Sequence, residues 1–142
     1  MRLFLDGSDI AHLTLASQES SEPWDIQEYQ CAPEEYLKKI DEYIKSKGKS
    51  TKDIFAISIV TGPGSATALR MSLAIVDTWH FVLGTPMIPH EKVAGELIVD
   101  YLNTWSRQGD ENGEYKKFLY PIYSRDPQIT TSTKDSLKRP IN

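Results

Sequence analysis

The sequence is poor in the residues that bind metals or form disulfides. It contains one cysteine, Cys31, and three histidines, His12, His80 and His90, among 142 residues. A single cysteine cannot form an intrachain disulfide, so we expect the protein to work in a reducing compartment, the cytoplasm. The histidines show no paired metal-ligand spacing, and no metal site is predicted.

Long apolar runs and a strong basic charge are also missing. No stretch approaches the roughly 20 apolar residues that a membrane-spanning helix needs, and the N-terminal apolar run is too short for a signal peptide. The net charge is −4, and the isoelectric point is about 5.4. A global field that would attract nucleic acid is therefore excluded, so any tRNA contact must be local or supplied by a partner.

The pattern of apolar and polar residues predicts one mixed α/β domain. Two short apolar runs, 2–5 and 11–16, flank Asp6-Gly7-Ser8-Asp9 and predict a β-hairpin with its turn at these four residues. The other predicted elements are strands over 24–29, 54–60 and 86–89, helices over 33–47, 66–83 and 91–105, and an edge strand over 115–123.

The helix predicted over 66–83 has more apolar surface than one sheet can cover. Its apolar arc spans roughly 200°, whereas packing on one sheet face requires roughly 100°. Arg70 and Asp77 mark the only clearly polar stripe. This excess predicts a second packing surface for the helix.

The turn Gly62-Pro63-Gly64-Ser65 links a buried strand to this helix. It lacks the GxxxxGK[ST] pattern of a P-loop and the GxGxxG pattern of a dinucleotide site. Two interpretations stay open. Glycines permit a sharp structural turn with Ser65 as helix cap, while free amides at a helix start make an anion site.

Asp6-Gly7-Ser8 also has two interpretations. It is either a turn held by Asx hydrogen bonds or, as in actin-like and ribonuclease-H-like folds, a carboxylate site for a metal or nucleotide. Metal catalysis would need a second carboxylate from a later strand, and the predicted strand over 54–60 has none. Ser65 also lacks the GxSxG context of a serine hydrolase.

The segment TGPGSATALR, residues 61–70, resembles the GPGSFTGLR signature of the TsaB (YeaZ) family, the non-catalytic subunits of the bacterial machinery for tRNA threonylcarbamoyladenosine (t6A). Leu3-Phe4-Leu5-Asp6-Gly7-Ser8 is similar to the family's first strand. Residues 83–88 and 121–125 are similar to two later elements. The sequence departs from the family at Ala66, Ala68 and Ser72. Set against the family pattern, we expect the second half of the fold to be largely deleted.

The resemblance implies a ribonuclease-H-like, actin-like ATPase fold, with a single N-terminal lobe over 1–105 built on a mixed five-stranded sheet and a remnant of the second lobe over 106–125. The composition of residues 126–142 predicts a flexible tail. It implies a scaffold that has no catalytic residues and binds a TsaD-type catalytic subunit, with a TsaE-type ATPase as a further partner. The scaffold is expected to contact tRNA only indirectly and to form a homodimer when alone. No membrane is involved. The expected partner interface consists of Tyr36, Leu37, Ile40, Met71, Ile75 and Trp79.

No cofactor is expected on the isolated chain, and ATP or ADP is expected only within the complex. A weak phosphate or nucleotide site would comprise Asp6, Ser8, Gly62, Gly64 and Ser65. Two alternatives to the scaffold remain open. One is a small nucleotide-binding, ATPase-like enzyme that uses this site, and the other is a stand-alone homodimeric interaction module.

Overall fold

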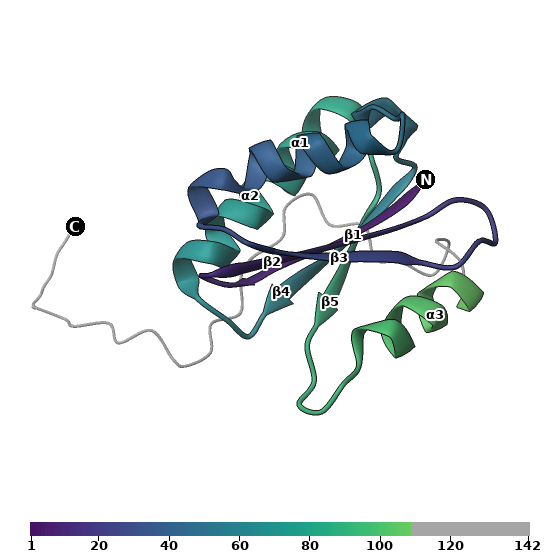
Figure 1. The fold of residues 1–142 in the computed structure, drawn as a ribbon. Coiled ribbons are helices and arrows are strands. Elements are labelled where there is room, and N and C mark those ends of the chain that lie inside the picture. Colours follow the sequence, from purple (N-terminus) through teal and green to yellow (C-terminus); the bar gives the residue numbers. More distant parts are fainter. Residues whose placement is uncertain (109–142) are drawn as a thin grey trace, which may run out of the picture.

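The fold is a five-stranded sheet with helices on both faces, seen in a computed structural model that describes residues 1–108 (Figure 1). The elements in chain order are β1 Arg2–Asp9, β2 His12–Gln18, β3 Asp25–Gln30, the 3-10 turn η1 Pro33–Glu35, α1 Tyr36–Ser46, η2 Thr51–Asp53, β4 Ala56–Gly62, α2 Ala66–Leu83, β5 Met87–Glu91 and α3 Ile98–Gln108.

The strand order is β3-β2-β1-β4-β5. β1 pairs antiparallel with β2 and parallel with β4, and β5 pairs parallel with β4. Every residue of β4 is buried, as expected for a strand covered on both faces. The predicted mixed α/β sheet is therefore confirmed.

Two apolar clusters lie on the two faces of the sheet. α1 and α2 cover one face and α3 covers the other (Figure 1). Leu3 and Leu5 of β1 belong to the cluster under α1 and α2, whereas Phe4 between them belongs to the cluster with Trp105 of α3. This alternation follows from the two-residue period of a strand.

The predicted hairpin is present, but its turn lies elsewhere. Asp6 is still paired with Thr14, and a bulge separates Asp6 from Asp9. The chain reverses at residues 10–11, where the Ala11 N–H donates a 2.8 Å hydrogen bond to Asp9 Oδ1. The expectation of a turn at Asp6–Asp9 is wrong, because these four residues continue β1 and the chain reverses only after Asp9. The expected Asx hydrogen bond at Asp6 is present, with the Ser8 N–H as its donor.

The predicted third helix is also displaced. Glu91 is the last residue of β5 and pairs with Gly62 of β4, and α3 begins only at Ile98. Gly95 has a φ of 81° in the intervening loop, a conformation that a continuous helix excludes. β1 runs four residues beyond its predicted end, and residues 33–35 of the predicted first helix form the 3-10 turn η1. The remaining predicted elements agree with the structure to within about two residues at each end.

The predicted edge strand over 115–123, the rest of the second-lobe remnant and the tail over 126–142 lie outside the described residues. Within residues 1–108, no helix is both long enough and apolar enough to cross a membrane.

Candidate functional site

The candidate site lies where the carboxyl ends of β1, β4 and β5 meet. Ligand sites of open α/β sheets occur at this edge, because loops leaving parallel strands converge there. β1 contributes Asp6 and Ser8, the β4–α2 turn contributes Gly64 and Ser65, and the segment after β5 contributes Lys92.

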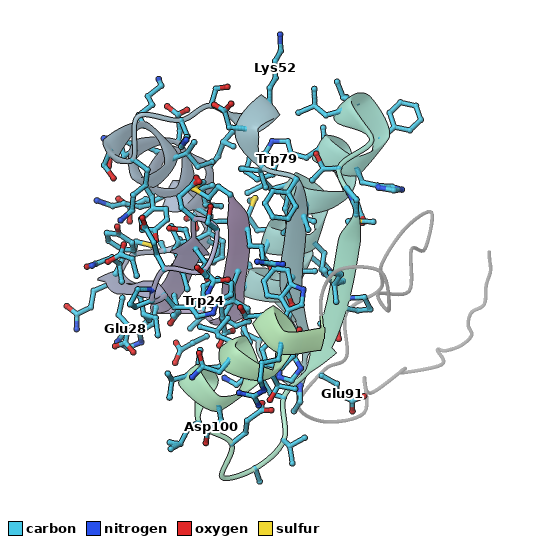
Figure 2. All side chains as sticks on the ribbon, turned by 90° about the vertical axis from the view of Figure 1, so that its right-hand side faces the viewer. Trp24, Glu28, Lys52, Trp79, Glu91 and Asp100 are labelled. Atoms are coloured by element: carbon cyan, nitrogen blue, oxygen red, sulfur yellow. The ribbon has the colours of Figure 1, made fainter. Side chains whose placement is uncertain are left out.

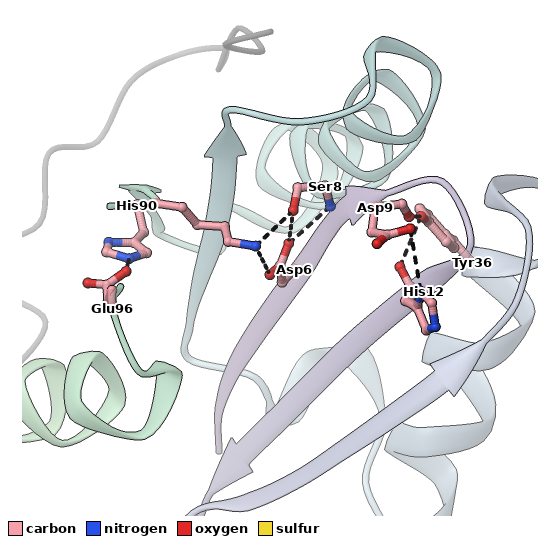
Figure 3. Close-up of polar contacts among 8 residues, drawn as sticks. Asp6, Ser8, Asp9, His12, Tyr36, His90 and Glu96 are labelled. Carbon is pink, nitrogen blue, oxygen red and sulfur yellow. Dashed lines mark hydrogen bonds and ion pairs between the residues drawn. The ribbon is translucent and has the colours of Figure 1, made fainter. Parts of the chain in front are cut away.

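Asp6 and Ser8 form a compact local unit (Figure 3). The Ser8 backbone N–H donates a 3.0 Å hydrogen bond to Asp6 Oδ1, and the Ser8 hydroxyl donates a 2.6 Å bond to the same oxygen. Both residues are buried, at 8% and 5% exposure. Asp6 Oδ1 therefore already accepts two hydrogen bonds from within the protein.

The Gly62–Ser65 turn lies directly against this unit. A Cβ on Gly64 would be 2.4 Å from the Ser8 carbonyl oxygen, so no side chain fits there. The Ser65 N–H donates a 2.8 Å hydrogen bond to that oxygen, and the Ser65 hydroxyl accepts the Ala68 N–H at 3.4 Å as the helix cap. The glycine and serine thus hold the start of α2 against the end of β1.

Lys92 is the site residue that the sequence did not reveal. Its ammonium group donates hydrogen bonds of 3.2 Å to Asp6 Oδ2 and 3.3 Å to Ser8 Oγ, drawn as dashed lines in Figure 3. Residues 91–105 were expected to form a helix, which would not place Lys92 at the end of a strand. The basic residue just after the strand-like run MIPHE is the signal that could have identified it.

The three histidines make separate contacts. His90 Nε2 lies 2.7 Å from Glu96 Oε1, His12 Nδ1 lies 3.4 Å from Asp9 Oδ1, and His80 Nδ1 lies 2.8 Å from the Thr85 carbonyl oxygen. Among residues 1–108 there is no group of three His, Cys, Asp or Glu side chains that could hold a metal ion.

Tyr36 lies beneath the β1–β2 turn. Its hydroxyl donates a 2.9 Å hydrogen bond to the Asp9 carbonyl oxygen, and burial, aided by negative charge nearby, raises the pKa of Tyr36 to about 12. Tyr36 and Ile40 are completely buried in the core of the chain. Their expected place on a partner interface is therefore corrected, since neither side chain exposes surface that a partner could contact.

The other predicted interface residues are more accessible. Leu37 is 56% exposed, Met71 is 37% exposed, and Ile75 lies at the edge of the core with 9% exposure. A groove of about 280 Å³ between α1 and α2, hereafter the α1–α2 groove, is lined by Leu37, Ala74, Ile75, Thr78 and Trp79. Trp79 stands on this side of the sheet in Figure 2. Three of the six predicted residues therefore line one groove.

A protein-family model and several curated proteins match the sequence. The model, described as TsaD: tRNA N6-adenosine threonylcarbamoyltransferase, matches residues 33–106, just over half of the chain. Two proteins named tRNA N6-adenosine threonylcarbamoyltransferase, from Streptococcus pneumoniae strains Hungary19A-6 and Taiwan19F-14, are each 27% identical over 100 residues. The match covers 68% of this chain and only 30% of each relative.

Several solved structures share the fold. YeaZ from Pseudomonas aeruginosa superposes with a TM-score of 0.59 and 20% identity, and covers 66% of this chain and 44% of the YeaZ chain. A second structure, of an uncharacterized protein with similarity to peptidase YEAZ from Pseudomonas aeruginosa, gives a TM-score of 0.57 at the same identity and coverage. At this identity the likeness concerns the fold, which in YeaZ is that of the actin-like ATPases.

Proposed function

The chain belongs to the TsaD family, and from this premise we propose that it is a non-catalytic subunit that binds a TsaD-type threonylcarbamoyltransferase and supports t6A formation in tRNA. The chain spans about 30% of the length of the curated transferases that it matches.

The observation that carries this proposal is the α1–α2 groove. Its walls are largely apolar, and Leu37 remains 56% exposed at its rim. Its volume of about 280 Å³ lies just below the range for small-molecule pockets, roughly 300–1,000 Å³. A groove of this size between two helices suits side chains of an apolar helix from another protein.

Trp79 gives the groove the character of a protein-binding site. Tryptophan is enriched among the residues that contribute most to protein–protein affinity, and Trp79 is packed against the core from the side of the groove. Its indole is thus held before a partner arrives, which lowers the entropy cost of binding. Met71, on the same helix, would lie at the periphery of the contact.

Binding between the full chain and the TsaD-type subunit of the same organism tests the proposal by isothermal titration calorimetry. Leu37→Asp places a charge in the groove, and we expect at least about a tenfold loss of affinity. Val93→Asp is the matched control, because Val93 is 66% exposed and lies in the loop beyond β5. Equal affinity for Leu37→Asp, Trp79→Ala and the unaltered chain would contradict the proposal.

A homodimer is the other use of the same groove, because its exposed apolar walls can pair with a second copy. Light scattering of the chain with and without the transferase distinguishes the homodimer from the complex with the transferase. The proposal expects any dimer to dissociate as the heterodimer forms. A dimer that persists in the presence of excess transferase favours the stand-alone interaction module instead.

A further inference from the structure

We propose that Lys92 is a built-in counter-cation that prevents Asp6 from binding a divalent metal or a metal–nucleotide complex. The actin-like fold implies a magnesium–nucleotide site at the end of β1, and the residues present here do not fit one. This inference rests on the Asp6–Ser8–Lys92 contacts and is independent of the partner proposed above.

Both oxygens of the Asp6 carboxylate already have donors. Oδ1 accepts the backbone N–H and the hydroxyl of Ser8 at 3.0 and 2.6 Å. Oδ2 faces the Lys92 ammonium at 3.2 Å, and this ammonium also lies 3.3 Å from Ser8 Oγ. The Asp6 side chain is only 10% exposed and the Lys92 ammonium lies 3.2 Å from Oδ2, so little of the carboxylate is left for a ligand.

The position of Lys92 is set by its backbone. The Lys92 N–H donates a 2.8 Å hydrogen bond to the Gly62 carbonyl oxygen, and Glu91 before it pairs with Gly62 in the sheet. The side chain therefore starts from a fixed point beside the β4–α2 turn. Its ammonium does not have to be ordered from a mobile loop when it pairs with Asp6.

A magnesium ion could not share this place. Mg²⁺ binds oxygen ligands at about 2.0–2.1 Å in octahedral geometry, and it would need Oδ2 while facing the like charge of Lys92. Lysine donates protons and has no lone pair to offer a cation. The pair also neutralises the carboxylate that would otherwise attract the metal.

Metal binding by the full chain tests this inference, with Mn²⁺ as the probe and electron paramagnetic resonance of free Mn²⁺ as the readout. We expect no saturable site in the unaltered chain. Lys92→Met should gain a saturable site whose affinity is at least about tenfold higher than any binding of Mn²⁺ to the unaltered chain, because one like charge is removed. Lys92→Arg keeps the charge and should gain nothing. Lys52→Met is the matched control, since Lys52 is exposed and points away from the fold in Figure 2.

The double variant Asp6→Asn/Lys92→Met should lose the gained site. The inference is overturned if the unaltered chain binds Mn²⁺ as tightly as Lys92→Met, if Lys92→Met folds and gains nothing, or if the gain survives Asp6→Asn.

A second measurement applies even if Lys92→Met does not fold. Acetylation by acetic anhydride, followed by mass spectrometry of the folded chain, should modify Lys92 more slowly than Lys52. The difference should shrink in Asp6→Asn, because the ammonium loses its partner. Equal rates for Lys92 and Lys52 in the unaltered chain would overturn the inference. None of these readouts involves the transferase, so they are separate from the test of the proposed function.

Discussion

The imidazole of His90 stacks on the ring of Tyr101, with centroids 3.6 Å apart and ring planes 21° apart. The Tyr101 hydroxyl lies 2.6 Å from the Ser58 hydroxyl of β4, and His90 pairs with Glu96 at 2.7 Å. These contacts join α3 and the loop before it to two strands. The position of α3 is therefore set by directional polar contacts as well as by apolar packing.

Tyr101→Phe should destabilise the chain by about 1–2 kcal/mol, because the variant leaves the completely buried Ser58 hydroxyl without this partner. Urea denaturation monitored by circular dichroism gives the change in unfolding free energy. Asn103→Ala, at an exposed position of the same helix, is the control and should change stability by less than about 0.5 kcal/mol. Equal effects of the two variants would show that the Ser58 contact contributes nothing.

Gly64→Ala should lower the free energy of unfolding by about 3 kcal/mol or more. The new Cβ would lie 2.4 Å from the Ser8 carbonyl oxygen, and backbone atoms cannot move aside easily. Gly84→Ala is the comparison. Gly84 has a φ of +72° and nothing within 4 Å, so only the backbone strain of about 1 kcal/mol applies. Thermal denaturation of both variants measures the difference, and a Gly84 variant less stable than the Gly64 variant would contradict the steric explanation.

Asp25 makes the free energy of unfolding depend on pH in the acid range. Its hydrogen bond to Lys47 is the main cause of a pKa below the ordinary value of 3.8, and Lys47 Nζ lies 2.6 Å from Asp25 Oδ2. Because the folded pKa lies below the unfolded one, the stabilisation is present above about pH 4 and disappears as pH falls through the folded value. Asp25→Asn should lose at most about 1 kcal/mol at pH 7, since the pair is partly exposed.

The corresponding test compares urea denaturation at about pH 7 and about pH 3. Asp25→Asn should be closer to the unaltered chain in acid than at neutral pH. An equal difference at the two pH values would contradict the assignment. Asp41→Asn is the control, because the Asp41–Lys45 pair at 2.8 Å lies on an open helix surface and should have a smaller effect.

Tyr36 should ionise late in alkali. Burial raises its pKa to about 12, above the ordinary value of 10.0. The raised value means that the folded state favours the neutral phenol, a stabilisation that is present below about pH 10 and disappears as pH rises through about 12. In an alkaline titration followed by tyrosinate absorbance, Tyr36→Phe should lose the amplitude that the unaltered chain shows near pH 12, and none of the amplitude near pH 10. Loss of amplitude near pH 10 would contradict the burial of this hydroxyl.

The sequence predicted α2 to the residue because both of its end signals are local. Ser65 caps the first turn, and Gly84 ends the helix with a φ of 72°. The start of α3 was mispredicted for the opposite reason. Val93 and Leu97 continue the helical spacing of the residues after them, but both are exposed and precede the helix, because Gly95 turns the chain between them.

The candidate site was only partly accessible to sequence reasoning. Asp6, Ser8 and Gly64 were found because glycines and small polar residues mark a strand end. Lys92 was not, because its contact with Asp6 spans 86 residues and depends on how far β5 pairs with β4. The two faces of α1 were likewise confused. Tyr36 and Leu37 are neighbours in sequence, yet one is buried and the other is 56% exposed.

β1 is held in register from both sides, by β2 through Leu5↔Leu15 and by β4 through Leu5↔Ile59. A one-residue shift in the register of β1 would turn Leu3 and Leu5 toward the face that now holds Phe4, and would move the Asp6 carboxylate away from Lys92. Variants of this chain can thus alter the site by substitution of its side chains, but not by a shift in the register of β1. Length variation in this protein should be found at residues 10–11 and in the loops, with the span from Arg2 to Ser8 constant in length.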